Sequence, residues 1–262
     1  LKVDTQKIVE KITDFISSYI KKSGLKGAVV TVSGGIDSAV ALALTVKALG
    51  SEKVRAVTMP ERDITPEGDI TDVMQLAEAL DVTCDTVEIT PVIDVMKNIL
   101  PLYDQDDQTS SGNLKPRVRM TIAYHYANSL DYMVISSSNK SEWMTGYFTK
   151  HGDGAVDLMP LGDLYKCQIG QIARYLKIPD RILEKTPTAG LWPGQTDEGE
   201  IGASYDEIDL ILYGRGKGLT AEDIAKRTGI DFPVVEKILR RVDVNEHKRR
   251  IPLILRFSSI NG

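Results

Sequence analysis

The chain has 262 residues, a formal net charge of −5 at pH 7 and hydrophobic residues at 42% of its positions. A chain of this length and composition can bury one large α/β core or two small ones. Proteins that grip nucleic acid by its phosphates are usually basic, so the negative charge argues against RNA or DNA as a partner. No apolar run approaches the roughly 20 residues that a helix needs to cross a bilayer, so we expect no membrane partner either.

Two cysteines, Cys84 and Cys167, lie far apart and belong to no paired motif. This spacing argues against a disulfide framework, a zinc cluster or a thiol relay. It fits a reducing compartment, and we therefore expect a cytoplasmic protein.

The first half of the chain alternates between helical and strand-like segments. It opens with an amphipathic helix whose apolar residues recur at helical spacing: Ile8, Ile12, Phe15, Ile16, Tyr19 and Ile20. Short β-branched runs, typical of buried parallel strands, follow at 28–32, 54–59, 83–89 and 132–136. Helical segments lie between and beside them, at 38–49, 66–80, 91–100 and 115–130. This alternation predicts an α/β fold, a doubly wound parallel sheet of about five strands with helices on both faces.

Beyond Ser138 the alternation stops. Two stretches have no apolar period and are predicted to be loops: 103–113, which precedes Ser138, and 186–202, which follows it. Long loops of this kind are typical of functional lids, and 186–202 is our lid candidate. Further helices are predicted at 166–176, 205–212, 221–228 and 234–242. Because no repeat or linker divides the chain, we expect a single domain over 1–262.

The strongest local signal is Ser33-Gly34-Gly35-Ile36-Asp37-Ser38, between a predicted strand and a predicted helix. A turn of small residues there lets backbone N–H groups and the helix dipole hold phosphate. The motif is not a Walker A loop, because the Gly-Lys-Ser/Thr ending is absent. Asp37 would repel phosphates unless it holds Mg²⁺, which bridges carboxylate and phosphate oxygens. The structural alternative is an ordinary strand-to-helix turn with a capping side chain.

This hexapeptide resembles the SGGxDS signature of the pyrophosphatase-loop ATP enzymes. The resemblance implies an adenine nucleotide alpha-hydrolase-like fold and cleavage of ATP between its α and β phosphates. It leaves the substrate open.

The second half narrows the resemblance to the NAD synthetase family. Its motifs are spread over nearly the whole chain, at 136–142, 145–150, 152–157, 160–166, 187–189, 204–209 and 247–249. The chain ends near Gly262 without room for a glutaminase domain, so it looks like the ammonia-dependent branch. The resemblance implies a ligase that amidates deamido-NAD with ammonia and ATP through an acyl-adenylate. It also implies Mg²⁺ as cofactor and a homodimer.

The resemblance further implies a role for each matching residue. Catalysis falls to Asp37 and Lys166, and the metal ligands are Asp37 and Glu142. The ATP contacts are Ser33, Gly34, Gly35, Ile36, Asp37, Ser38, Ser137, Lys166 and Thr188. The deamido-NAD contacts are Arg117, Lys150, Asp157, His247 and Lys248. Ser137 stands where the family more often has Thr, and it keeps the hydroxyl.

Structural alternatives exist for several of these residues. Glu142 could be a solvated acid at a helix start, and Lys150 and Asp157 could form a surface ion pair of little energetic value. Arg119 is about as easily explained by an exposed helix face. Lys166 begins a predicted helix, where a cation is unfavourable by about 0.3–1 kcal/mol, and this mismatch favours a function for it.

Two other function classes need to be weighed against this one. The first is a different ligase or an RNA thiolase on the same fold, against which stand the negative charge and the unpaired cysteines. The second is a non-catalytic nucleotide-binding module. Such a module has no need of Asp37, Glu142 and Lys166.

Overall fold

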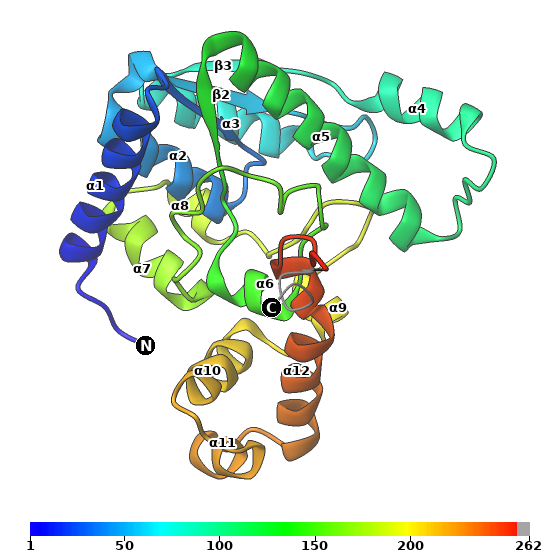
Figure 1. Ribbon diagram of the computed structural model, residues 1–262. Helices are drawn as coiled ribbons and strands as arrows, with labels where there is room; N and C mark the ends of the chain where they lie inside the picture. The colour runs from blue at the N-terminus through cyan, green and yellow to red at the C-terminus, as the bar shows by residue number, and fades with distance from the viewer. Residues whose placement is uncertain (256–262) are drawn as a thin grey trace, which may run out of the picture.

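The computed structural model describes residues 1–255. At its centre lies a parallel sheet in the strand order β3-β2-β1-β4 (Figure 1). The strands are β1 (Gly27–Thr31), β2 (Val54–Thr58), β3 (Thr83–Thr86) and β4 (Tyr132–Ile135). The predicted parallel α/β fold is confirmed, with four strands instead of about five. Beside β4 the chain adds only an isolated bridge between Ile135 and Leu158, which does not extend into a fifth strand.

Alternate residues of each strand face opposite layers of helices. Val30 is aligned with Ala56 and Ile135, and all three belong to one core. The helices packed there are α1 (Thr5–Ser23), α2 (Ile36–Leu49), α3 (Glu67–Ala79), α7 (Lys166–Tyr175) and α8 (Asp180–Leu183). Val29 and Val134 face the second core, with α4 (Thr90–Ile99) and α5 (Gln108–Leu130). The helices therefore cover both faces, as predicted.

Two details of the sequence prediction were wrong. Phe15 and Tyr19 of α1 are 45% and 47% exposed, because the face of α1 that is buried in the core is formed by Val9, Ile12, Ile16 and Ile20, with Ile8 packed beside them. Helix α5 begins at Gln108, inside a predicted loop, because the side chain of Asp107 accepts a hydrogen bond from Ser110 N and caps a first turn that has no apolar period.

The C-terminal helices form a separate apolar core at the end of the molecule shown at the bottom of Figure 1. They are α10 (Tyr205–Gly216), α11 (Ala221–Thr228) and α12 (Phe232–Val244), followed by the 3-10 turn η2 (Asn245–Arg249). The short helices α6 (Lys140–Thr145) and α9 (Asp197–Ile201) lie between this unit and the sheet, and a 3-10 turn η1 (Ser51–Lys53) precedes β2. Helix α10 packs against both α6 and α7.

The strand order places the site. From β1 the chain moves outward to β2 and β3, and β4 then pairs with the other side of β1. The segments that leave β1 and β4 therefore diverge from neighbouring carboxyl ends, the position where open α/β sheets bind ligands. Among residues 1–255, no helix is both long enough and apolar enough to cross a membrane.

Candidate active site

The loop from Ser33 to Ser38 connects β1 to α2 in a tight turn. Ser38 Oγ accepts a hydrogen bond from Ser33 N at 3.2 Å and donates one to the Gly35 carbonyl at 2.9 Å. Gly34 has φ +86°, and a Cβ atom there would lie 2.9 Å from Cβ of Asp69, so no larger residue fits. Held in this way, the start of α2 presents backbone N–H groups suited to phosphate.

Three charged side chains from three elements meet beside this loop. Lys166 Nζ lies 2.5 Å from Asp37 Oδ2 and 3.5 Å from Glu142 Oε1. Asp37 is in the first turn of α2, Glu142 in that of α6, and Lys166 is the first residue of α7. Their side chains are only 12–15% exposed. The structure therefore brings together the three charged residues that the resemblance had singled out.

Asn139 joins two of these groups. Its Nδ2 donates to Asp37 Oδ1 at 2.8 Å, and its Oδ1 accepts from Glu142 N at 3.0 Å. Its own N–H donates to Glu142 Oε2 at 3.3 Å, which completes a capping box at the start of α6. The side chain is completely buried. Asn139 was not among the predicted site residues, although Asn followed three residues later by Glu is the signature of a capping box.

When both carboxylates are ionised, Asp37, Glu142 and Lys166 together carry one negative charge, which a bound cation can balance. Burial, and then the charge of Asp37, raises the pKa of Glu142 to about 8. Burial acts to lower the pKa of Lys166, but the charges of Asp37 and Glu142 outweigh it and raise this pKa above its ordinary value. Two carboxylates already converge on one cation, and their oxygens are ligands that Mg²⁺ prefers. These residues therefore fit a magnesium ion.

The described residues do not supply enough side-chain ligands to surround a metal ion by themselves. Within residues 1–255, no group of three or more His, Cys, Asp or Glu side chains is arranged to hold a metal ion. Magnesium is commonly held by one or two carboxylates, with substrate phosphates and water completing its shell. The pair of Asp37 and Glu142 matches that pattern.

Two further charged residues near the site were not foreseen. Asp197 is 4% exposed and accepts a hydrogen bond from the hydroxyl of Tyr205, whose ring lies under Lys166 Nζ at 4.9 Å. Lys185 Nζ donates to the Gly34 carbonyl at 3.0 Å and pairs with Asp69 and Asp72 at 2.5 and 2.6 Å. Lys185 thus connects the Ser33–Ser38 loop to the segment that enters the lid candidate.

The remaining ATP candidates flank the charged cluster. Ser137 is half-buried just past the carboxyl end of β4. Thr188 is exposed in the lid candidate, and its hydroxyl accepts a hydrogen bond from Gly190 N at 3.1 Å. The same segment is anchored at Leu191, whose carbonyl accepts a hydrogen bond from Lys115 Nζ at 2.5 Å. The predicted loop also contains the short helix α9.

The deamido-NAD candidates gather on one short segment, with one exception. Arg117 Nη2 donates to the Lys150 carbonyl at 3.3 Å. Lys248 Nζ donates to the carbonyls of Gly146 and Phe148 at 2.8 and 3.1 Å, and His247 is exposed next to it in η2. These residues therefore converge on 146–150.

Asp157 is the exception. It accepts hydrogen bonds from Val134 N at 2.8 Å and Tyr124 Oη at 3.1 Å. In this structure its carboxylate holds the chain against β4.

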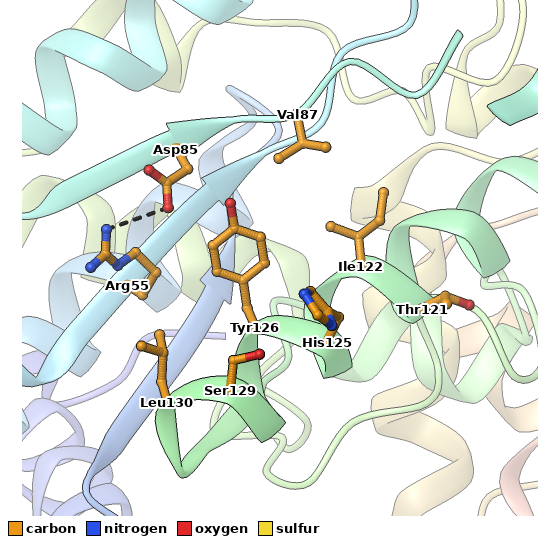
Figure 2. A pocket seen from close by; sticks show the side chains of 9 residues that line it. All are labelled: Arg55, Asp85, Val87, Thr121, Ile122, His125, Tyr126, Ser129 and Leu130. Atoms are coloured by element: carbon orange, nitrogen blue, oxygen red, sulfur yellow. Dashed lines mark hydrogen bonds and ion pairs between the residues drawn. The ribbon is translucent and has the colours of Figure 1, made fainter. Parts of the chain in front are cut away.

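A hollow outside this cluster lies on another part of the molecule. It measures about 700 Å³ and is bounded by β2, β3 and the second half of α5. Figure 2 shows its lining, with the Tyr126 hydroxyl pointing toward Asp85 and the Arg55–Asp85 ion pair at one side. It contains none of the predicted site residues. The charged cluster is the better candidate for an active site, because its charges and N–H groups are suited to chemistry on phosphate.

The chain is similar to known proteins over nearly its whole length. A family model described as NAD synthase matches residues 8–252. The NH(3)-dependent NAD(+) synthetase of Methanosarcina acetivorans is 43% identical over 250 residues, which cover 95% of this chain and 98% of that protein. The structure of NMN synthetase from Francisella tularensis has a TM-score of 0.86 at 34% identity and covers 98% of this chain and 100% of that one. The NH3-dependent NAD synthetase from Campylobacter jejuni, solved with nitrate, has a TM-score of 0.81 at 31% identity, with 97% and 100% covered.

Proposed function

The chain belongs to the NAD synthase family, and we propose that the charged cluster beside the Ser33–Ser38 loop is where it carries out the family's reaction. The chain is a carbon–nitrogen ligase that amidates deamido-NAD to NAD with ammonia and ATP, releasing AMP and pyrophosphate. The family, the enzyme class and the reaction implied by the sequence are thereby confirmed. The observation that carries the placement is the meeting of Asp37, Glu142 and Lys166 at the carboxyl ends of β1 and β4.

The reaction has two steps. A nicotinate carboxylate oxygen attacks the α-phosphorus of ATP, and the bond from this phosphorus to the bridging oxygen breaks. Pyrophosphate leaves with that electron pair toward the N–H groups of the Ser33–Ser38 loop. Ammonia then attacks the carbonyl carbon of the acyl-adenylate, AMP departs with the bonding electrons, and the nitrogen loses a proton. The residues supply position and charge, without a covalent enzyme intermediate.

Each candidate residue has a part in this scheme. The ammonium of Lys166 stabilises the negative charge that develops on the phosphates, and the hydroxyls of Ser137 and Thr188 contact ATP. Asp37 and Glu142 would hold Mg²⁺, which when bound neutralises phosphate charge. The segment 186–202 closes over the nucleotide and excludes water, which would otherwise hydrolyse the adenylate.

The dinucleotide site is proposed around 146–150. Arg117, Lys150, His247 and Lys248 supply positive charge or hydrogen-bond donors suited to its phosphates. Asp157 remains part of the proposal through the family resemblance, although its carboxylate now accepts two protein hydrogen bonds.

We also propose a homodimer. Apolar side chains on and after α4 are exposed, among them Val95 at 57%, Ile99 at 65% and Leu102 at 95%. A second copy covering this face would remove apolar surface from water. Sedimentation at micromolar concentration should give twice the chain mass, and a monomeric mass contradicts the dimer.

Two further expectations stay part of the proposal. One is that 1–262 forms a single domain, supported by the packing of α10 against α6 and α7. The other is the cytoplasmic location.

The test is pyrophosphate release by purified protein with ATP, Mg²⁺, deamido-NAD and ammonium. Because the Francisella relative is named an NMN synthetase, nicotinate mononucleotide is the second candidate substrate and is assayed in parallel. A larger kcat/KM for deamido-NAD is the expected result. A preference for the mononucleotide would reassign the substrate while leaving the site and the chemistry in place.

A further inference from the structure

Asp209 of α10 is a buried carboxylate that neither the loop motif nor the charged cluster includes. It is 1% exposed, although its helix is otherwise packed through apolar residues. Its Oδ1 accepts a hydrogen bond from the Ser141 hydroxyl, and its Oδ2 accepts one from Cys167 N at 2.8 Å. Both oxygens are thus used, and each reaches a different helix.

The two hydrogen bonds fall on the first turns of α6 and α7. Ser141 Oγ also accepts a hydrogen bond from Lys166 N at 3.1 Å. The first N–H groups of a helix have no partner within the helix. In α7 the N–H groups of Lys166 and Cys167 are therefore satisfied from outside, by Ser141 and Asp209. An anion is also the group that the dipole favours at a helix N-terminus, and it offsets the cation that Lys166 places there.

The residues that make these contacts are adjacent in the sequence to residues of the proposed active site. Ser141 directly precedes Glu142, and Cys167 directly follows Lys166. One carboxylate from α10 therefore fixes the backbone on both sides of the Glu142–Lys166 pair, whose charged atoms lie 3.5 Å apart. This gives the C-terminal helices a direct connection to the charged cluster.

We propose that Asp209 is a positioning residue that sets Glu142 and Lys166 for binding Mg²⁺–ATP. The proposal rests on the function proposed above. A purely structural link could be made by a neutral side chain at lower cost, because an ionised carboxylate is expensive to bury. The carboxylate is needed where two donors from different helices must both be accepted at fixed geometry. An amide in its place keeps the shape but has only one accepting atom.

The test compares two variants with a control from the same helical unit. Asp209→Asn removes one accepting atom, and Ser141→Ala removes the hydroxyl that links Asp209 to Lys166 N. Thr220→Ala removes the cap of α11, where Thr220 Oγ1 accepts from Asp223 N at 3.2 Å, away from the site. Calorimetric titration measures the Kd of Mg²⁺–ATP, and melting curves measure stability.

Residues that orient ligating groups commonly change affinity or activity by about 10–100-fold when replaced. Asp209→Asn and Ser141→Ala should each raise the Kd of Mg²⁺–ATP by at least about 10-fold and lower kcat similarly, with the KM for ammonium unchanged. Thr220→Ala should lower the melting temperature without changing the Kd. If Asp209→Asn does not fold, Ser141→Ala decides the matter. A folded variant of either kind with wild-type Kd overturns the proposal.

The titration separates this proposal from the proposed function. Wild-type protein that binds Mg²⁺–ATP but releases no pyrophosphate would refute the function while the Kd comparison still judges Asp209. Wild-type protein that binds no Mg²⁺–ATP overturns both.

Discussion

Asn139 Nδ2 donates a hydrogen bond to Asp37 Oδ1 at 2.8 Å, although the two residues are 102 positions apart. Asp37 follows β1 and Asn139 follows β4, so this bond joins the neighbouring strands where their connections diverge. Because Asn139 also caps α6, it fixes the position of the helix that carries Glu142 relative to the Ser33–Ser38 loop. The amide of Asn139 therefore contacts both members of the proposed metal-binding pair.

Replacing Asn139 with Ala should therefore affect both stability and activity. Loss of a helix cap costs about 0.5–2 kcal/mol, and the freed Asp37 carboxylate should raise the Mg²⁺ concentration needed for half-maximal activity. The control Thr220→Ala removes a cap of similar value from α11. The two variants should melt similarly, but only Asn139→Ala should change the magnesium dependence. If Asn139→Ala and Thr220→Ala had the same magnesium dependence, Asn139 would serve only as a helix cap.

Lys166→Ala should depress turnover by about 10²–10³, the usual cost of removing one preorganised charge partner. Lys166→Arg should not restore it fully, since a planar guanidinium does not replace a compact ammonium in a tight site. The helix dipole alone would favour removal of this cation. The structure predicts the opposite for metal-free protein, because the change leaves Asp37 and Glu142 facing each other unpaired. Melting curves of Lys166→Ala in EDTA should show destabilisation that Mg²⁺ reverses. Turnover of this variant at the wild-type rate would contradict the role proposed for Lys166.

Stability of the metal-free protein should fall as pH rises. The pKa of Glu142 is raised from 4.5 to about 8, chiefly by burial. An acidic group whose pKa is raised in the folded state contributes stability that is fully present below its unfolded-state pKa. This stability is lost as the pH rises through its folded-state pKa. Unfolding free energy in EDTA should therefore decline between about pH 5 and pH 8, and Glu142→Gln should flatten this part of the profile. Added Mg²⁺ should stabilise wild type more at pH 8 than at pH 6. The same slope in Glu142→Gln would assign it to another group.

Ammonium, and not glutamine, should support turnover by the 262-residue chain. The curated Methanosarcina relative, named as NH(3)-dependent, is matched over 98% of its length. Both free cysteines have a pKa raised chiefly by burial, which is unsuited to a thiolate nucleophile of the kind that hydrolyses glutamine. Initial rates with each nitrogen donor decide the point. Efficient use of glutamine by the purified chain would contradict it.

Much of the fold could be predicted because its signals are local. Short β-branched runs separated by amphipathic helices specify a parallel sheet, and each strand was found within three residues of its predicted ends. The helices α6 and α9 could not be found in this way, because six and five residues are too few to show an apolar period. The width of the buried stripe on α1 also depends on its partners, which the sequence does not display.

The site could be predicted only in part, because some of its contacts join residues far apart in the sequence. The six residues of the Ser33–Ser38 loop are contiguous and follow a strand, so the sequence itself indicates a binding turn there. Lys166 and Glu142 were reached through family resemblance, and their approach to Asp37 follows from the switch point between β1 and β4. Asp209 is hydrogen-bonded to Ser141, 68 positions away along the chain, and Lys185 to Gly34, 151 positions away. Nothing in their local sequence marks those contacts.

We propose that this cluster forms an acyl-adenylate with a metal held at Asp37. Exchange of labelled pyrophosphate into ATP, with Mg²⁺ and deamido-NAD but without ammonium, measures that step alone. Wild-type protein should catalyse exchange only when deamido-NAD is present. Asp37→Asn should fold normally but lose exchange, because a neutral amide binds Mg²⁺ far less well than a carboxylate. Exchange that is absent from wild type, or undiminished in Asp37→Asn, would contradict adenylate formation at this cluster.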